Sequence, residues 1–183
     1  MKELSLNILD IAKNSVKAGA DTVEITLTET NETFDICIKD DGCGMTPEFL
    51  ASVTDPFTTT RTTRKVGLGI PLFKLACEQT GGEFRIASRD VSSHPEDHGT
   101  ETGATFYKNH IDFTPLGDVV STVVTLIQAD PEIRWIFTHR MPDKTVSLDT
   151  NELKAVLGDV PLNVPDVITW IGAYLTEQYE TQE

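Results

Sequence analysis

The spacing of apolar residues divides the first part of the chain into a helical segment and an extended one. Between residues 3 and 18 apolar side chains recur every three or four positions, which predicts an amphipathic helix that ends at Gly19. Residues 22 to 30 and 33 to 40 alternate apolar and polar side chains across a short turn. This alternation predicts a β-hairpin with one buried face.

The same two periods return after an interruption. Residues 41 to 66 are rich in Gly, Pro and Thr and have little periodicity, so we expect a long loop there. Residues 68 to 80 regain the helical period. Residues 84 to 89 and 104 to 108 predict two more strands, joined by a polar loop.

The C-terminal part, residues 111 to 183, carries further elements of both kinds. An apolar helical stripe runs from 116 to 127 and a strand pattern from 133 to 137. Asp149 and Asn163 are expected to cap two later helices. Aromatic residues in periodic segments belong in the core by default. Those expected there are Trp135, Phe137 and Trp170.

Composition excludes several classes of binding partner and indicates the cellular compartment. The chain has 183 residues and a formal net charge of −14, so its field repels nucleic acid and anionic lipid. It has no apolar run of the ~20 residues that a membrane span needs. Its three cysteines lack the close spacing of a zinc site or a disulfide framework. We therefore expect a soluble, cytoplasmic protein that does not bind nucleic acid or membranes.

Two polar patterns in the first half suggest chemistry, although each has an ordinary structural explanation. Asn7, Asp10, Asn14 and Lys17 share one face of the first helix, which alone is most simply a solvated face. The run from Asp40 to Met45 ends a strand with Asp-Asp-Gly-Cys-Gly-Met, which alone is most simply a tight turn. A carboxylate there accepts hydrogen bonds from an amine, and the glycines allow the backbone to approach a flat ligand.

A third pattern concerns phosphate. Gly67, Leu68 and Gly69 immediately precede a helix, whose free N–H groups and dipole favour anions, although a lone Gly-x-Gly is a weak signal. Three basic residues lie just before it in an otherwise acidic chain, and they suit a triphosphate. They are Arg61, Arg64 and Lys65.

The order of these segments resembles the GHKL superfamily of histidine kinases, DNA gyrase B, heat-shock chaperone ATPases and mismatch-repair ATPases, over about residues 4 to 109. Five boxes are similar. They are the N box at 9 to 17, the G1 box at 40 to 45, the F box at 55 to 61, the G2 box at 67 to 70 and the last glycine-threonine box at 103 to 106. The resemblance implies an α+β fold, the two-layer Bergerat ATP-binding sandwich, over residues 1–110. Residues 111–183 would add a small α/β segment of unknown role.

The resemblance also implies residue roles. Asp40 would read the adenine amine, with Gly42 and Gly44 beside the base. Asn14 would ligate Mg²⁺ and Lys17 would touch a phosphate. Residues 55 to 69 would form the ATP lid. The other nucleotide-binding residues carried over from the boxes are Met45, Phe57, Thr59, Arg61, Gly67, Leu68, Gly69 and Thr105.

The sequence departs from the family's pattern in two places. Gyrase-like members have a glutamate where this chain has Asp10, which is one methylene shorter; it would serve either as the base of a slow hydrolysis or only as a supporting residue. The four histidines follow the G2 box outside any helical His-Glu context, so we expect loop or surface histidines rather than a phosphoacceptor. They are His94, His98, His110 and His139.

Two functions follow as expectations. The first is a Mg²⁺-dependent ATP-binding protein that acts as a slow ATPase, or as a protein kinase that phosphorylates a partner in trans, like the serine kinases that act as anti-sigma factors. The alternative is a non-catalytic ATP-sensing regulatory module whose lid closure controls a protein partner.

Overall fold

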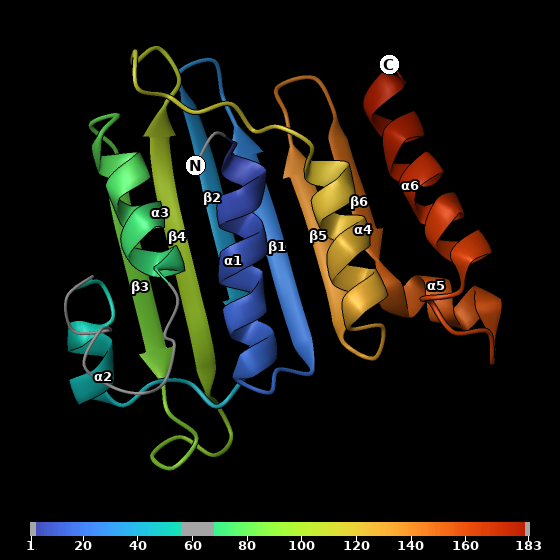
Figure 1. Cartoon of the computed structure of the whole chain (residues 1–183), viewed down its shortest axis with the longest axis horizontal. Coiled ribbons are helices and arrows are strands. Elements are labelled where there is room, and N and C mark those ends of the chain that lie inside the picture. The colour runs from blue at the N-terminus through green and yellow to red at the C-terminus, as the bar shows by residue number, and fades with distance from the viewer. Residues whose placement is uncertain (1–2, 56–67, 182–183) are drawn as a thin grey trace.

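The computed structural model describes residues 3–55 and 68–181, and in this part of the chain six strands form one mixed sheet with helices against one face (Figure 1). The strand order is β3-β4-β2-β1-β5-β6. The elements are α1 (Leu4–Lys17), β1 (Thr22–Glu29), β2 (Thr33–Asp40), α2 (Pro47–Ser52), α3 (Gly69–Glu78), β3 (Glu83–Arg89), β4 (Gly99–Tyr107), α4 (Val119–Ala129), β5 (Arg134–Arg140), β6 (Thr145–Asp149), α5 (Thr150–Leu157) and α6 (Pro165–Glu180). The expected two-layer α+β fold is confirmed.

The core lies between the sheet and α1, α3, α4 and α6. Leu4 and Ile8 of α1 are fully buried, as are Leu27 and Ile36 of the hairpin, which face each other across β1 and β2. Alternate residues of these strands point to the other, polar face of the sheet, because successive strand side chains alternate. One buried face per element is what the sequence pattern predicted.

Two elements differ from the expectations for the first half. β4 begins at Gly99, five positions before the expected start, and α2 lies inside the stretch expected to be a loop. Thr46 caps α2 by accepting a hydrogen bond from the amide of Phe49 at 3.3 Å, and Pro47 suits the first helical position. A six-residue helix is too short to show a period.

The C-terminal segment extends the same sheet across the boundary expected at residue 110. β5 pairs in parallel with β1, and β6 pairs with β5 as an edge strand that was not predicted. Trp135 and Phe137 are 2% exposed, which confirms their core positions. Trp170 is 51% exposed, so its expected core position is wrong.

The predicted helix caps in this segment have different outcomes. Asp149 caps α5 as expected, and its carboxylate accepts a hydrogen bond from the amide of Asn151 at 2.9 Å. Asn163 does not cap α6, since Val164 occupies the N-cap position and Pro165 begins the helix. Proline lacks an amide N–H and is common at this first position, so the helix begins without a side-chain cap.

His139, expected in a loop or on the surface, instead lies in β5 with 2% of its area exposed. Its Nδ1 lies 2.7 Å from the hydroxyl of Tyr179 in α6, and its Nε2 lies 3.3 Å from Oε2 of Glu29, outside hydrogen-bond geometry. Lys108 contacts Oε1 of Glu29 at 2.5 Å. This cluster joins α6 to β1, to β5 and to the residue that follows β4, at one end of the sheet.

The cluster predicts a pH-dependent stability. Burial lowers the pKa of His139, and Glu29 opposes that shift only in part. Because the unfolded chain takes up this proton near pH 6.5 while the folded protein resists it, folding stability is expected to fall below about pH 6.5. Urea unfolding from about pH 8 to about pH 5.5 checks this. His139→Gln should lessen the loss of stability at low pH, whereas His94→Gln, at an exposed position, should not. Equal losses in the wild type and both variants would contradict the prediction.

Candidate functional site

The end of β2 holds the carboxylate that the sequence singled out. Asp40 is half-buried, and its Oδ2 accepts a hydrogen bond from the hydroxyl of Ser15 at 2.6 Å. Its Oδ1 accepts one from the amide of Gly42 at 2.9 Å. Ser15 is buried on α1, so the helix and the following turn fix this carboxylate from two sides.

The turn after Asp40 requires its glycines. A Cβ on Gly42 would lie 2.7 Å from the Cβ of Ala18, at the end of α1. Gly44 has φ of 69°, and a Cβ there would lie 1.9 Å from the carbonyl oxygen of Arg89. The amide of Cys43 donates to the carbonyl of Ala18 at 2.9 Å. Backbone contacts on both sides therefore seat the turn against α1 and the end of β3.

The start of α3 lies against the polar face of α1. Gly69 is the first residue of α3, and a Cβ on it would lie 3.2 Å from the Cβ of Asp10 and 4.0 Å from Nδ2 of Asn14. Asp10 is exposed and Asn14 is half-buried. The structure thus brings the side chains of Asp10 and Asn14 beside the start of α3, whose first N–H groups have no partner within the helix.

Three further predicted site residues lie in the described part of the chain. Lys17 is exposed in the last turn of α1, on the same helix face as Asn14. Met45 is half-buried, and its amide donates to Oγ of Ser88 at 2.8 Å. Leu68 precedes α3 and is 51% exposed. The other predicted phosphate- and nucleotide-binding residues lie outside the described residues: Phe57, Thr59, Arg61, Arg64, Lys65 and Gly67.

Thr105 does not join this site. It pairs with Asp35 across β4 and β2, and its hydroxyl donates to Oδ1 of Asp35 at 2.7 Å on the outer face of the sheet. Asp40 instead pairs with Thr100, and Ile38 with Thr102. Because side chains alternate between the two faces, Thr100 and Thr102 are the β4 threonines on the side of Asp40.

Sequence analysis missed two residues that position the site. Ser15 lies among the apolar positions of the first helix, and a polar residue at such a position is the signal that was available. His98, expected in a loop or on the surface, lies with Nδ1 2.5 Å from the carbonyl oxygen of Gly42. No spacing in the sequence indicates that contact, because 56 residues separate the two.

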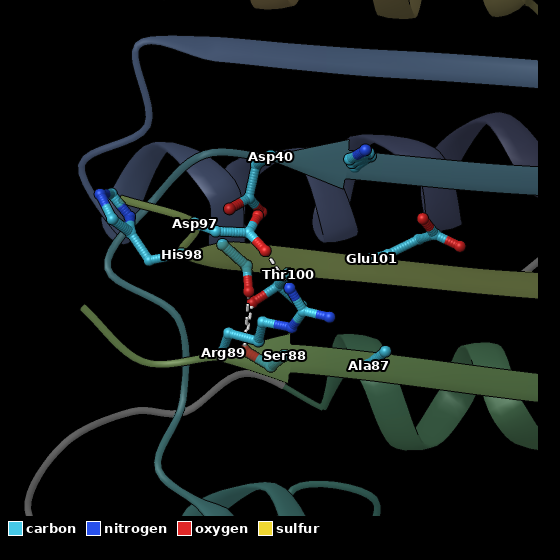
Figure 2. A pocket seen from close by; sticks show the side chains of 10 residues that line it. Asp40, Ala87, Ser88, Arg89, Asp97, His98, Thr100 and Glu101 are labelled. Carbon is cyan, nitrogen blue, oxygen red and sulfur yellow. Dashed lines mark hydrogen bonds and ion pairs between the residues drawn. The ribbon is translucent and has the colours of Figure 1, made fainter. Parts of the chain in front are cut away.

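Two open cavities lie at this end of the sheet and share Asp40, Lys39, Asp97 and His98. Figure 2 shows the one of about 240 Å³, where Asp97 pairs with Arg89 and the hydroxyls of Thr100 and Ser88 lie 2.8 Å apart. The larger cavity, about 540 Å³, carries more carboxylates. They are Asp21, Glu24, Asp40, Asp41, Glu96 and Asp97. Because these carboxylates repel phosphate, an anion is expected to bind beside α1 and α3 rather than in this cavity.

Neither a metal cluster nor a membrane span accompanies this site in the described residues. Residues 3–55 and 68–181 contain no group of three or more His, Cys, Asp or Glu side chains placed to hold a metal ion. Within the same residues, every helix is too short or too polar to cross a membrane.

Comparison with known proteins finds similar sequences and similar solved structures. The sensor protein SrrB of Staphylococcus aureus (strain NCTC 8325 / PS 47) is 39% identical over 94 residues, so the match spans 48% of this chain but only 16% of SrrB. The N-terminal domain of a DNA repair protein has a similar fold, with a TM-score of 0.57 and 13% identity over 81% of this chain and 53% of that one. The Aquifex aeolicus MutL ATPase domain complexed with ADP gives a TM-score of 0.49 and 14% identity over 86% and 69%.

The family described as histidine kinase-, DNA gyrase B-, and HSP90-like ATPase matches residues 2–115, which include α1, the turn after β2, α3 and β4. This match covers more than half of the chain and contains every residue of the site. The chain therefore belongs to the histidine kinase-, DNA gyrase B-, and HSP90-like ATPase family and carries its kinase-like, ATP-binding type of module.

Proposed function

We propose that the protein binds ATP with Mg²⁺ between α1, the end of β2 and the start of α3, and acts as a slow ATPase or as a kinase on a protein partner in trans. The observation that carries this proposal is the approach of Gly69 to Asp10 and Asn14. It sets the N-terminus of a ten-residue helix beside the side chains of Asp10 and Asn14, at the same end of the sheet as Asp40 (Figure 1).

Asp40 is suited to read adenine. A carboxylate has about four lone-pair directions, and Ser15 and Gly42 use one on each oxygen. The 6-amino group of adenine can donate to a remaining lone pair, whereas guanine presents a carbonyl oxygen at that position. The proposed site should therefore prefer ATP to GTP.

The phosphates would meet the start of α3. Its free N–H groups and the positive end of its dipole attract anions. Asn14 offers an amide oxygen, a hard ligand of the kind that Mg²⁺ accepts while it keeps several waters and shares phosphate oxygens. Bound Mg²⁺ would neutralise charge on the phosphates. Lys17 adds a cation on the same face, and Arg61 is proposed to add another.

Asp10 decides between the two forms of the proposal. Its Cβ lies against the start of α3, so the carboxylate can orient a water or an acceptor hydroxyl near the terminal phosphate. Aspartate reaches less far than glutamate, which favours slow hydrolysis or an acceptor supplied by a partner. If Asp10 plays no part in chemistry, ATP acts only as a ligand that selects the closed form of the protein.

An ATP titration followed by product analysis tests these alternatives. With γ-labelled ATP and Mg²⁺, the wild-type protein should release phosphate or label an added partner, and EDTA should abolish both. Asp10→Asn should slow that step by about a hundredfold or more while ATP affinity stays nearly unchanged. Asp143→Asn is the matched control, since Asp143 is exposed in the β5–β6 turn away from the site.

Each outcome selects one form of the proposal. Binding without any product selects the regulatory module. Turnover that Asp10→Asn leaves unchanged removes Asp10 from the chemistry, and absence of ATP binding overturns the proposed function as a whole.

A further inference from the structure

Helix α6 exposes two stacked aromatic rings between two carboxylates. Trp170 and Tyr174 have ring centroids 5.0 Å apart and planes inclined by 9°, and 51% and 37% of their areas are exposed. Asp166 lies four residues before Trp170 and Glu177 three residues after Tyr174; both are exposed. Residues at this spacing share one helix face. We call the four residues the aromatic stripe.

The rotation of α6 that exposes the aromatic stripe is fixed by contacts on its other side. Val167, Ile171 and Leu175 are buried in the core, where α6 packs against α4 and β6. The side-chain amide of Gln178 accepts a hydrogen bond from the amide of Ser147 at 2.9 Å and donates one to its carbonyl at 3.0 Å. This pair of bonds ties α6 to the edge strand β6. The aromatic stripe is therefore a preformed outward surface.

The segment that carries the aromatic stripe has charge of one sign. Residues 155 to 183 contain five Asp or Glu residues and no Lys, Arg or His. Lys144, which contacts the end of α6, is already occupied there by the carbonyl oxygens of Tyr179 and Thr181. Electron-rich ring faces flanked by carboxylates attract cations, and a guanidinium stacks on such rings better than an ammonium does.

We propose that the aromatic stripe docks a basic segment of a protein partner, with an arginine stacked on Trp170 or Tyr174 and basic side chains at Asp166 and Glu177. These carboxylates are 11 helical positions apart, or about 16 Å, which a short extended segment spans. A second copy of this chain is disfavoured as occupant, because two acidic stripes repel each other. α6 lies at the sheet edge opposite α3, so docking leaves the start of α3 open (Figure 1).

A synthetic peptide tests the proposal on the whole chain. The probe has an arginine at each end and one in the middle, separated by serine and leucine, and carries a fluorescent label for anisotropy at physiological salt. Tyr174→Ala and Trp170→Ala should each weaken binding by about fivefold or more. Replacing the arginines of the probe by lysine should also weaken binding. Sedimentation should show that the free protein does not self-associate through this face.

Matched variants separate docking from the general attraction between a basic peptide and an acidic protein. Tyr107→Ala removes a tyrosine of similar exposure on β4 and should leave affinity unchanged. Glu177→Gln should weaken binding more than Glu32→Gln, which makes the same change of charge in the exposed β1–β2 turn. Equal effects of the two glutamine variants, no effect of the aromatic variants, or self-association abolished by Trp170→Ala would overturn the proposal. The variants leave the ATP site intact, so these results are independent of ATP binding.

Discussion

Asp40→Asn is expected to weaken ATP binding about tenfold to a hundredfold and to reduce the preference for ATP over GTP. A hydrogen bond to a charged group contributes about 1.5–3 kcal/mol, and every 1.4 kcal/mol is about tenfold in affinity. The amide of Gly42 needs an acceptor, so the oxygen of the new side chain should remain there. Its NH₂ group then replaces Oδ2, where Ser15 can reverse its hydroxyl and accept. The turn persists, but an acceptor for the adenine amine is lost.

Calorimetric titrations with ATP and with GTP measure this effect, and Asp41→Asn is the matched control. Oδ1 of Asp41 accepts hydrogen bonds from the amides of Asp21 and Thr22, both at 2.8 Å. An asparagine oxygen can accept both bonds, so this variant removes the same charge one residue away without disturbing the turn. If both variants lose affinity equally, local charge explains the loss, and Asp40 does not recognise the base.

Much of the fold could be predicted because most of its elements bury one face only. The helical period over residues 3 to 18 matches α1, and the alternation before and after residue 31 matches β1 and β2. The start of β4 could not be predicted from such a pattern, since Gly99 to Thr102 contains no apolar side chain. Gly99 is needed there because a Cβ would lie 2.0 Å from the carbonyl oxygen of Asp40. The close approach of the two backbones requires a glycine, and a glycine in the sequence predicts a loop rather than a strand.

The order of the site residues along the chain could be predicted, but the pairing of β4 with β2 could not. Asp40, Gly42 and Gly44 follow one another along the chain, so their proximity needs no tertiary information. The choice between Thr105 and Thr102 depends on how β4 pairs with β2, and an odd shift in position moves a side chain to the other face of the sheet. Spacing within one strand does not specify that pairing.

The exposure of Trp170 and of His139 was predicted wrongly, because tertiary contacts decide it. Trp170 and Ile171 are neighbours in one apolar stretch of α6, yet only Ile171 faces the core. The helix rotation that separates them is set partly by Gln178, which bonds to an edge strand that the sequence did not predict. His139 is buried for a related reason, because β5 joins β1 from more than 100 positions further along the chain.

Gly44→Ala is expected to lower the free energy of unfolding by about 2–5 kcal/mol and to abolish ATP binding at accessible concentrations. Adopting the left-handed conformation costs a non-glycine residue about 1–2 kcal/mol. Here the new methyl would also collide with the carbonyl oxygen of Arg89, and forced repacking of this kind costs typically about 1–3 kcal/mol more. The turn can relieve the collision only by moving away from β3, which displaces Met45 and the bond between Gly42 and Asp40.

Gly81→Ala separates the backbone cost from the collision. Gly81 has φ of 75°, close to that of Gly44, but a Cβ there would have no atom within 4 Å. Its variant should lose only the roughly 1–2 kcal/mol of the left-handed conformation and should bind ATP like the wild type. Urea unfolding and ATP titration of both variants make the comparison. Similar destabilisation of the two proteins, or normal ATP affinity in Gly44→Ala, would mean that contact between the turn and β3 does not shape the nucleotide site.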